Sequence, residues 1–191
     1  MTRLAFLPPP ALAALIAVSC AVTPDATAES PGAVDATHAV TATGLEAGDL
    51  APDVALTGRD GASWTLSEAL QRGPVVLIFY RGHWCPKCRG QLDRLQARLA
   101  EVEGKGASLV AISVDAAEDT NELADKHGYT FPLLADPDLA AIKAYGVEDV
   151  GNDISLPATV VVGKDGKITF IYVGDAPGDR PAEDMSIAAI P

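Results

Sequence analysis

Cysteine is scarce in this 191-residue sequence, which has three, and aromatic residues make up only 5%. Three cysteines are too few for a disulfide-built scaffold, and they divide into Cys20 alone and the pair Cys85 and Cys88. Hydrophobic residues nevertheless amount to 48% and charged residues to 21%. That balance excludes a disordered chain and predicts one globular domain with a sizeable core.

Basic residues are also in short supply. The 14 Lys and Arg stand against 26 Asp and Glu, which leaves a formal charge of −12. A chain of this charge repels nucleic acid, so no nucleic-acid partner is expected.

Residues 4–18 form an apolar stretch behind Arg3 that is too short to span a bilayer and is typical of an export signal. The stretch ends at Ala17-Val18-Ser19-Cys20, which resembles the lipobox of bacterial lipoproteins. We therefore expect a lipoprotein-type signal peptide over residues 1–19, lipid attachment at Cys20, and a protein exported to the periplasm or cell envelope. A rival cleavage site after Ala26-Thr27-Ala28 corresponds to simple secretion.

The rest of the chain divides at about residue 44. Residues 20–43 are rich in Ala, Thr, Pro and Asp without apolar periodicity, which predicts a flexible linker. Residues 44–191 carry all the strand and helix patterns and form the expected folded domain. Contact with a membrane is expected only through a lipid on Cys20.

Strand and helix patterns alternate in the folded part. Continuous apolar runs at 75–80 and 107–114 indicate strands buried on both faces. Helices are expected at 86–103, 118–127, 136–145 and 181–189, with a short helix opened by Ser67, and a hairpin at 159–162 and 168–173. The order predicts an α/β fold: a sheet with a parallel core and an antiparallel edge hairpin, flanked by helices.

The most specific motif is Cys85-Pro86-Lys87-Cys88, which lies where the 75–80 strand meets the long helix. Pro86 suits the first helical position, which places Cys85 at the helix N-cap and makes its sulfur the more exposed one. Free backbone N–H groups, the helix dipole and nearby basic residues all stabilise a thiolate there. The motif predicts a redox-active pair of low pKa.

A zinc site, haem attachment and an inert disulfide each fit the residues around Cys85 and Cys88 less well than a redox-active pair does. A structural zinc site needs two more ligands at similar spacing, and no metal is expected. Haem attachment requires His after the second Cys, where Arg89 stands, and an inert disulfide gains little from so short a loop. His83 and Trp84 are as consistent with packing beside the motif as with a catalytic role for His83.

Residues 80–88 resemble the active-site stretch of the thioredoxin superfamily, and most closely that of peroxiredoxin-like proteins of the alkyl hydroperoxide reductase/thiol-specific antioxidant type. The likeness continues at 48–53, 111–115, 163–168 and, as a loop, at 131–136. It implies a thioredoxin-like fold and a cofactor-free oxidoreductase regenerated by a thioredoxin-type dithiol.

The resemblance also implies roles for single residues. Pro157 matches the cis-proline that faces the active cysteines in thioredoxin-like folds, and Arg180 matches an active-site arginine that holds the thiolate. Pro157, Trp84 and Arg81 are the residues expected to contact the substrate. The peroxiredoxin motif Pro-x-x-x-Thr/Ser-x-x-Cys, laid over the chain without gaps, puts its cysteine at Cys88, its Thr at Cys85 and its Pro at Arg81.

Two mechanisms remain open. In a peroxidase, a thiolate attacks a hydroperoxide to give a sulfenic acid, and the second cysteine condenses with it to a disulfide. In a thiol:disulfide oxidoreductase, the thiolate attacks a protein disulfide and the second cysteine resolves the mixed disulfide. The N-cap position favours Cys85 as the attacking residue, whereas the family register favours Cys88; we expect Cys85. A third reading is a binding module whose Cys85–Cys88 disulfide stays closed.

Overall fold

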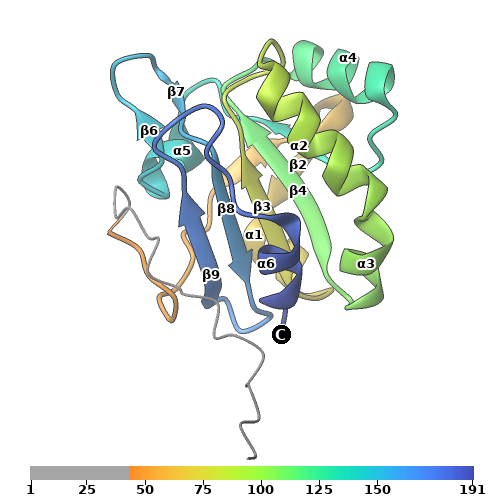
Figure 1. The fold of residues 1–191 in the computed structure, drawn as a ribbon, viewed down its shortest axis with the longest axis vertical. Coiled ribbons are helices and arrows are strands. Elements are labelled where there is room, and N and C mark those ends of the chain that lie inside the picture. Colours follow the sequence, from red (N-terminus) through yellow and green to blue (C-terminus); the bar gives the residue numbers. More distant parts are fainter. Residues whose placement is uncertain (1–43) are drawn as a thin grey trace, which may run out of the picture. The chain divides into compact units, whose positions relative to one another are not determined.

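The computed structural model describes residues 44–191, and its centre is a seven-stranded mixed sheet (Figure 1). The predicted signal peptide over 1–19, the predicted lipid site at Cys20 and the predicted linker over 20–43 lie outside the described residues. The strands, in sheet order, are β2 (Ser63–Thr65), β1 (Ala55–Thr57), β5 (Leu133–Ala135), β4 (Ser108–Ser113), β3 (Val75–Phe79), β8 (Ala158–Val162) and β9 (Ile168–Val173).

The sheet has a parallel core, as the sequence predicts, although the sequence did not indicate β5. β3 pairs in parallel with β4, and β4 with β5, while β8 runs antiparallel to β3 with Ala158 opposite Phe79. The predicted hairpin is β8 with β9. A second hairpin, β1 with β2, extends the other edge, and β6 (Glu148–Asp149) with β7 (Ile154–Ser155) forms a separate two-stranded sheet.

Helices cover both faces of the sheet. They are α1 (Leu66–Leu70), α2 (Pro86–Ala97), α3 (Leu99–Gly104), α4 (Ala117–His127), α5 (Ala140–Ala144) and α6 (Glu183–Ala188), with a 3-10 turn at Arg59–Gly61. In Figure 1, α2, α3 and α6 lie in front of the sheet. Every residue of β3 is buried, because alternate side chains enter the two apolar clusters on opposite faces of the sheet.

Several sequence expectations are corrected in detail. The helix expected over 86–103 divides at Arg98, whose φ of −111° and ψ of 9° end α2 and begin α3. The apolar spacing continues through the break, so periodicity alone does not show it. Segment 131–136, expected as a loop, contains β5, and Thr65 rather than Ser67 caps α1.

The two remaining helices are shorter than expected. The helix predicted over 136–145 is α5, since Asp136 accepts hydrogen bonds from the backbone of Ala140 and Ile142 and precedes the helix. The terminal helix begins at Glu183, two residues beyond Pro181. No helix within residues 44–191 is long and apolar enough to cross a membrane.

Candidate active site

The redox motif lies at the carboxyl end of β3. Cys85 is the N-cap of α2 with extended backbone angles, and Pro86 occupies the first turn, as the sequence predicts. The backbone N–H of Cys88 donates a hydrogen bond to Cys85 Sγ at 3.3 Å. The positive end of α2 and this hydrogen bond therefore point at the Cys85 sulfur.

Both cysteines are free thiols and both are buried. Cys85 is 2% exposed and Cys88 is 0% exposed, so the expected difference in exposure is very small. The two side chains belong to the same apolar cluster as Tyr80 and Leu92, beneath α2. A reactant must therefore be small, or the surrounding segments must move, before it touches either sulfur.

The prediction of a low pKa is wrong for Cys88. Burial raises the pKa of the Cys88 thiol to about 11, and its hydrogen bond with Cys85 and the charge of Cys85 raise it as well. A hydrogen bond from the backbone of Arg81 and the positive charge of Arg180 lower it, but do not offset burial. In the reduced protein Cys88 keeps its proton at neutral pH.

Arg180 lies at the site, where the resemblance puts it. Its Nη2 donates to Cys88 Sγ at 3.1 Å, and its Nε donates to Gln91 Oε1 at 2.6 Å. Its Nη1 donates to the carbonyl oxygen of Pro177. Gln91 is 3% exposed and lies one turn after Cys88 on α2, so it holds the guanidinium against the sulfur.

A tight loop after β9 brings Arg180 to the cysteines. A Cβ on Gly174 would lie 2.2 Å from the carbonyl oxygen of Asp179, so only glycine allows the two backbones to approach this closely. The backbone N–H of Asp175 also donates to the Asp179 carboxylate at 3.1 Å. The sequence gives no direct sign of this closure.

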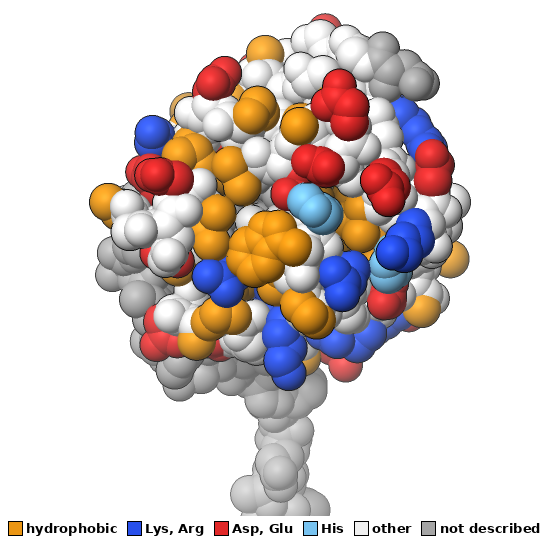
Figure 2. Space-filling model, turned by 90° about the horizontal axis from the view of Figure 1, so that it is seen from above, with side chains coloured by type: hydrophobic (Ala, Val, Ile, Leu, Met, Phe, Trp, Pro, Cys, Tyr) orange, Lys and Arg blue, Asp and Glu red, His pale blue; other side chains and the backbone are white. Residues whose placement is uncertain are grey.

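The surface around the motif combines an apolar side chain with positive charge. Trp84 is 50% exposed, and the guanidinium of Arg81 lies 5.4 Å from its ring centroid. Figure 2 views this end of the domain and shows hydrophobic side chains gathered at its centre, with Lys and Arg side chains mainly below and to the right and Asp and Glu side chains mainly above. Trp84 and Arg81 are thus available to a substrate or partner at the surface.

Pro157 lies next to the site but is not a cis-proline. Every peptide bond among residues 44–191 is trans, which corrects the expectation drawn from the resemblance. Pro157 is buried, it precedes the β8 residue opposite Phe79, and its carbonyl accepts a hydrogen bond from the Gly174 N–H at 2.8 Å. It therefore supports the start of the loop that carries Arg180.

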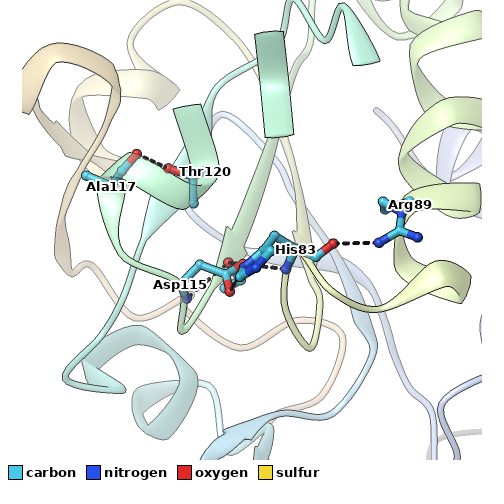
Figure 3. Close-up of polar contacts among 6 residues, drawn as sticks. His83, Arg89, Asp115, Ala117 and Thr120 are labelled. Atoms are coloured by element: carbon cyan, nitrogen blue, oxygen red, sulfur yellow. Dashed lines mark hydrogen bonds and ion pairs between the residues drawn. The ribbon is translucent and has the colours of Figure 1, made fainter. Parts of the chain in front are cut away.

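The structure adds Asp115, which the sequence argument did not connect to the motif. The Nδ1 of His83 lies 2.8 Å from Asp115 Oδ1, and the backbone N–H of His83 donates to Asp115 Oδ2 at 2.7 Å (Figure 3). Asp115 follows β4, the parallel neighbour of β3, and the carboxyl ends of parallel strands meet at one edge of a sheet. The prediction that these two strands are neighbours was the signal in the sequence that could have indicated this contact.

Metal ligation finds no support at the site. Across the part of the chain that the structure describes, no group of three or more His, Cys, Asp or Glu side chains is placed to hold a metal ion. The available chemistry is that of two thiols, one guanidinium and the backbone N–H groups around them.

Comparison with known proteins places the chain in one family and among thiol redox proteins. Residues 47–171 match the AhpC/TSA family. The chain is 34% identical over 128 residues to alkyl hydroperoxide reductase E of Mycobacterium tuberculosis, covering 66% of this chain and 84% of the relative. It is 27% identical over 142 residues to the thiol-disulfide oxidoreductase ResA of Halalkalibacterium halodurans, covering 74% and 76%.

Solved structures show the same fold. Peroxidoxin BcpB from Mycobacterium tuberculosis superposes with a TM-score of 0.70 at 26% identity, covering 76% of this chain and 96% of that one. AhpC of Enterococcus faecalis gives a TM-score of 0.69 at 20% identity, covering 76% and 90%, which supports the fold alone.

Proposed function

This chain belongs to the AhpC/TSA family and is a thiol oxidoreductase, and we propose that it reduces hydroperoxides through Cys85 and Cys88. One observation carries the proposal. Both sulfurs are buried, and the Arg180 guanidinium lies 3.1 Å from Cys88 Sγ. A hydroperoxide needs a smaller opening to reach these sulfurs than the disulfide of a folded protein does.

Cys85 is proposed as the first nucleophile. At neutral pH Cys88 is protonated, since burial raises its pKa to about 11, and a thiol attacks far more slowly than a thiolate. Cys85 Sγ faces the backbone N–H of Cys88 at the first turn of α2, which stabilises negative charge. The Cys85 thiolate attacks one peroxide oxygen, the O–O bond breaks, and the leaving alkoxide takes a proton to become an alcohol.

Cys88 then resolves the intermediate. Once Cys85 is a neutral sulfenic acid, its negative charge no longer raises the pKa of Cys88, while Arg180 and the Arg81 backbone still lower it. The Cys88 thiolate attacks Cys85 Sγ, an S–S bond forms, and hydroxide leaves with the proton that Cys88 released, as water. An external dithiol of the thioredoxin type supplies two electrons and two protons to restore both thiols.

The proposal is tested by the second-order rate constant for oxidation of the reduced protein by hydrogen peroxide and an organic hydroperoxide. The signal is the fluorescence of Trp84, with the Trp64 background measured in Trp84→Phe. Oxidation far faster than that of an ordinary thiol, with a sulfenic acid trapped by dimedone on Cys85 in Cys88→Ser, is the expected result. Trapping only on Cys88 in Cys85→Ser would reverse the order of attack, and a rate equal to that of a free thiol would reject the peroxidase.

Thiol:disulfide exchange is the second candidate. A C-x-x-C pair at a helix N-terminus beside the half-exposed Trp84 favours it, as does the similarity to ResA. A protein that is slow with peroxide but exchanges readily with a disulfide substrate belongs to this class. A pair that mild dithiol does not reduce instead supports a binding module with a closed disulfide.

We also propose that the protein is exported to the periplasm or cell envelope and anchored by a lipid on Cys20. The support is the apolar stretch over 4–18 and the Ala17-Val18-Ser19-Cys20 sequence at its end. Mass spectrometry of the protein from its native membrane fraction is expected to show a diacylated Cys20 at the N-terminus. An unmodified N-terminus at Glu29 would reject the anchor and favour secretion.

A further inference from the structure

Asp115 is a buried carboxylate that the proposed chemistry does not use. Its side chain is 5% exposed, and the residue lies two positions after the end of β4. Oδ2 accepts hydrogen bonds from the His83 backbone N–H at 2.7 Å and from Ser113 Oγ at 2.8 Å, and Oδ1 lies 2.8 Å from His83 Nδ1. A buried carboxylate is costly unless it is well hydrogen-bonded, so these donors define where it can lie.

Both His83 contacts hold the residue two positions before Cys85. The backbone contact fixes the chain and the ring contact fixes the side chain, and each uses one oxygen of the same carboxylate. Because a carboxylate only accepts, the proton of this contact is on Nδ1. The imidazole is 44% exposed and lines a 450 Å³ cavity together with Arg89 and Trp84.

The loop is held from its other side as well. Arg89 Nη1, from α2, donates to the His83 carbonyl at 2.9 Å, and Figure 3 shows this contact on the side of His83 away from Asp115. The Cys85 backbone N–H donates to the Gly82 carbonyl at 3.1 Å. Gly82 has a φ of +155°, and a Cβ there would lie 2.5 Å from Trp84 Nε1 and 3.0 Å from Asp115 Oδ1.

We propose that His83 and Asp115 are a positioning pair that holds Cys85 as the cap of α2 in the reduced enzyme. The cap hydrogen bond to Cys85 Sγ requires the loop over 82–85 in its present path, and Asp115 is the group that anchors this path to the sheet. The pair thereby stabilises the reduced form relative to the disulfide. A pair whose reduced form is stabilised is the stronger oxidant, so the contact sets the reduction potential.

The inference depends on thiol redox activity and not on a hydroperoxide as substrate. It is tested by the reduction potential of the Cys85–Cys88 pair, titrated against a dithiol buffer with the full-length protein. His83→Leu keeps a similar size without a donor, whereas His83→Asn keeps an N–H near the position of Nδ1. Asp115→Asn removes the negative charge, and its amide NH2 can face His83 Nδ1 only if the imidazole changes tautomer so that Nδ1 accepts.

His83→Leu and Asp115→Asn are expected to shift the equilibrium with the dithiol about tenfold toward the disulfide, about −30 mV. His83→Asn is expected to stay within about threefold of the wild type. The matched control is His127→Leu, which breaks a second His–carboxylate contact, 3.1 Å from Nδ1 to Asp93 Oδ1; His127 lines the same cavity but lies outside the loop over 82–85. It is expected to leave the potential unchanged.

Several outcomes would overturn the pair. A reduction potential of His83→Leu equal to that of the wild type would contradict the proposal. Equal shifts of the potential in His83→Leu and His83→Asn would contradict it as well, and so would the absence of any Cys85–Cys88 disulfide in the oxidised protein. If Asp115→Asn does not fold, the reduction potentials of the His83 variants test the proposal, because the His83 side chain is half-exposed and its substitution is better tolerated. Slow reaction with peroxide, together with a shifted potential in His83→Leu, rejects the proposed peroxidase and leaves the positioning pair intact.

Discussion

The contact between Arg180 and Cys88 makes the sharpest prediction, because one substitution separates two chemical steps. Arg180→Met keeps most of the length of the side chain and removes the guanidinium that donates to Cys88 Sγ at 3.1 Å. It also removes a positive charge that lowers the pKa of Cys88. The Cys88 thiolate is therefore harder to form in the variant.

The size of the effect follows from this contact. A hydrogen bond to a charged group contributes about 1.5–3 kcal/mol, which corresponds to a factor of roughly 10–150 in rate. Arg180 is half-buried, so solvent screening puts the expected loss near the lower end, about tenfold. Formation of the disulfide is expected to slow by this factor, while formation of the sulfenic acid on Cys85 slows less.

Single-turnover stopped-flow fluorescence with dimedone trapping resolves the two steps. Arg59→Met is the matched control, because it removes a guanidinium paired with Asp125 at the surface, where an ion pair is worth little. Disulfide formation in Arg180→Met within twofold of the control would refute the role of the guanidinium. Slowing of the first step alone would make Cys88 the residue that attacks peroxide.

Further predictions concern stability. Gly82→Ala is expected to lower the free energy of unfolding by about 1–3 kcal/mol, because its Cβ would lie 2.5 Å from Trp84 Nε1. Gly90→Ala is expected to raise it by about 0.5–1 kcal/mol in urea unfolding, because alanine favours the helix and the nearest heavy atom to its Cβ would be 3.8 Å away. Leu92→Ala empties a fully buried position and is expected to cost about 2–5 kcal/mol in the same assay. The folded pKa of Cys88 is raised from 9.0 to about 11, so the stability it contributes is complete below about pH 9 and is lost as pH rises to 11. Reduced wild type is expected to lose more stability over that range than Cys88→Ala, and parallel pH profiles would contradict this.

Much of the fold follows from local sequence patterns. The apolar run of β3 predicts a central strand because burial on both faces leaves no room for polar residues. The break at Arg98 is invisible to the same reasoning, since Leu95 and Leu99 keep helical spacing across it. β5 is three residues long, too short for a pattern of its own, and its parallel partner β4 is distant in sequence.

The site was predictable where its geometry is local. Pro86 in the first turn fixes Cys85 as the cap, because both depend only on where the helix begins. Asp115 and His83 are 32 residues apart, and their contact arises from strand pairing. The burial of both sulfurs and the high pKa of Cys88 likewise depend on packing that involves other segments, so the low pKa expected from the helix dipole alone was wrong for this residue.

The two competing assignments of the attacking cysteine rest on different arguments. The helix-cap argument selects Cys85 because backbone N–H groups stabilise its charge. The family register selects Cys88 because the cysteine of the motif falls at that position, and in the structure a guanidinium lies on its sulfur. Two thiolates on one helical turn repel each other, so only one of them forms at a time. In the proposed sequence, the backbone stabilises Cys85 for the first attack, and Arg180 stabilises Cys88 once the first charge has been consumed by the peroxide. Each stabilising group then acts at a different step, which is why removing Arg180 is expected to affect disulfide formation more than peroxide reduction.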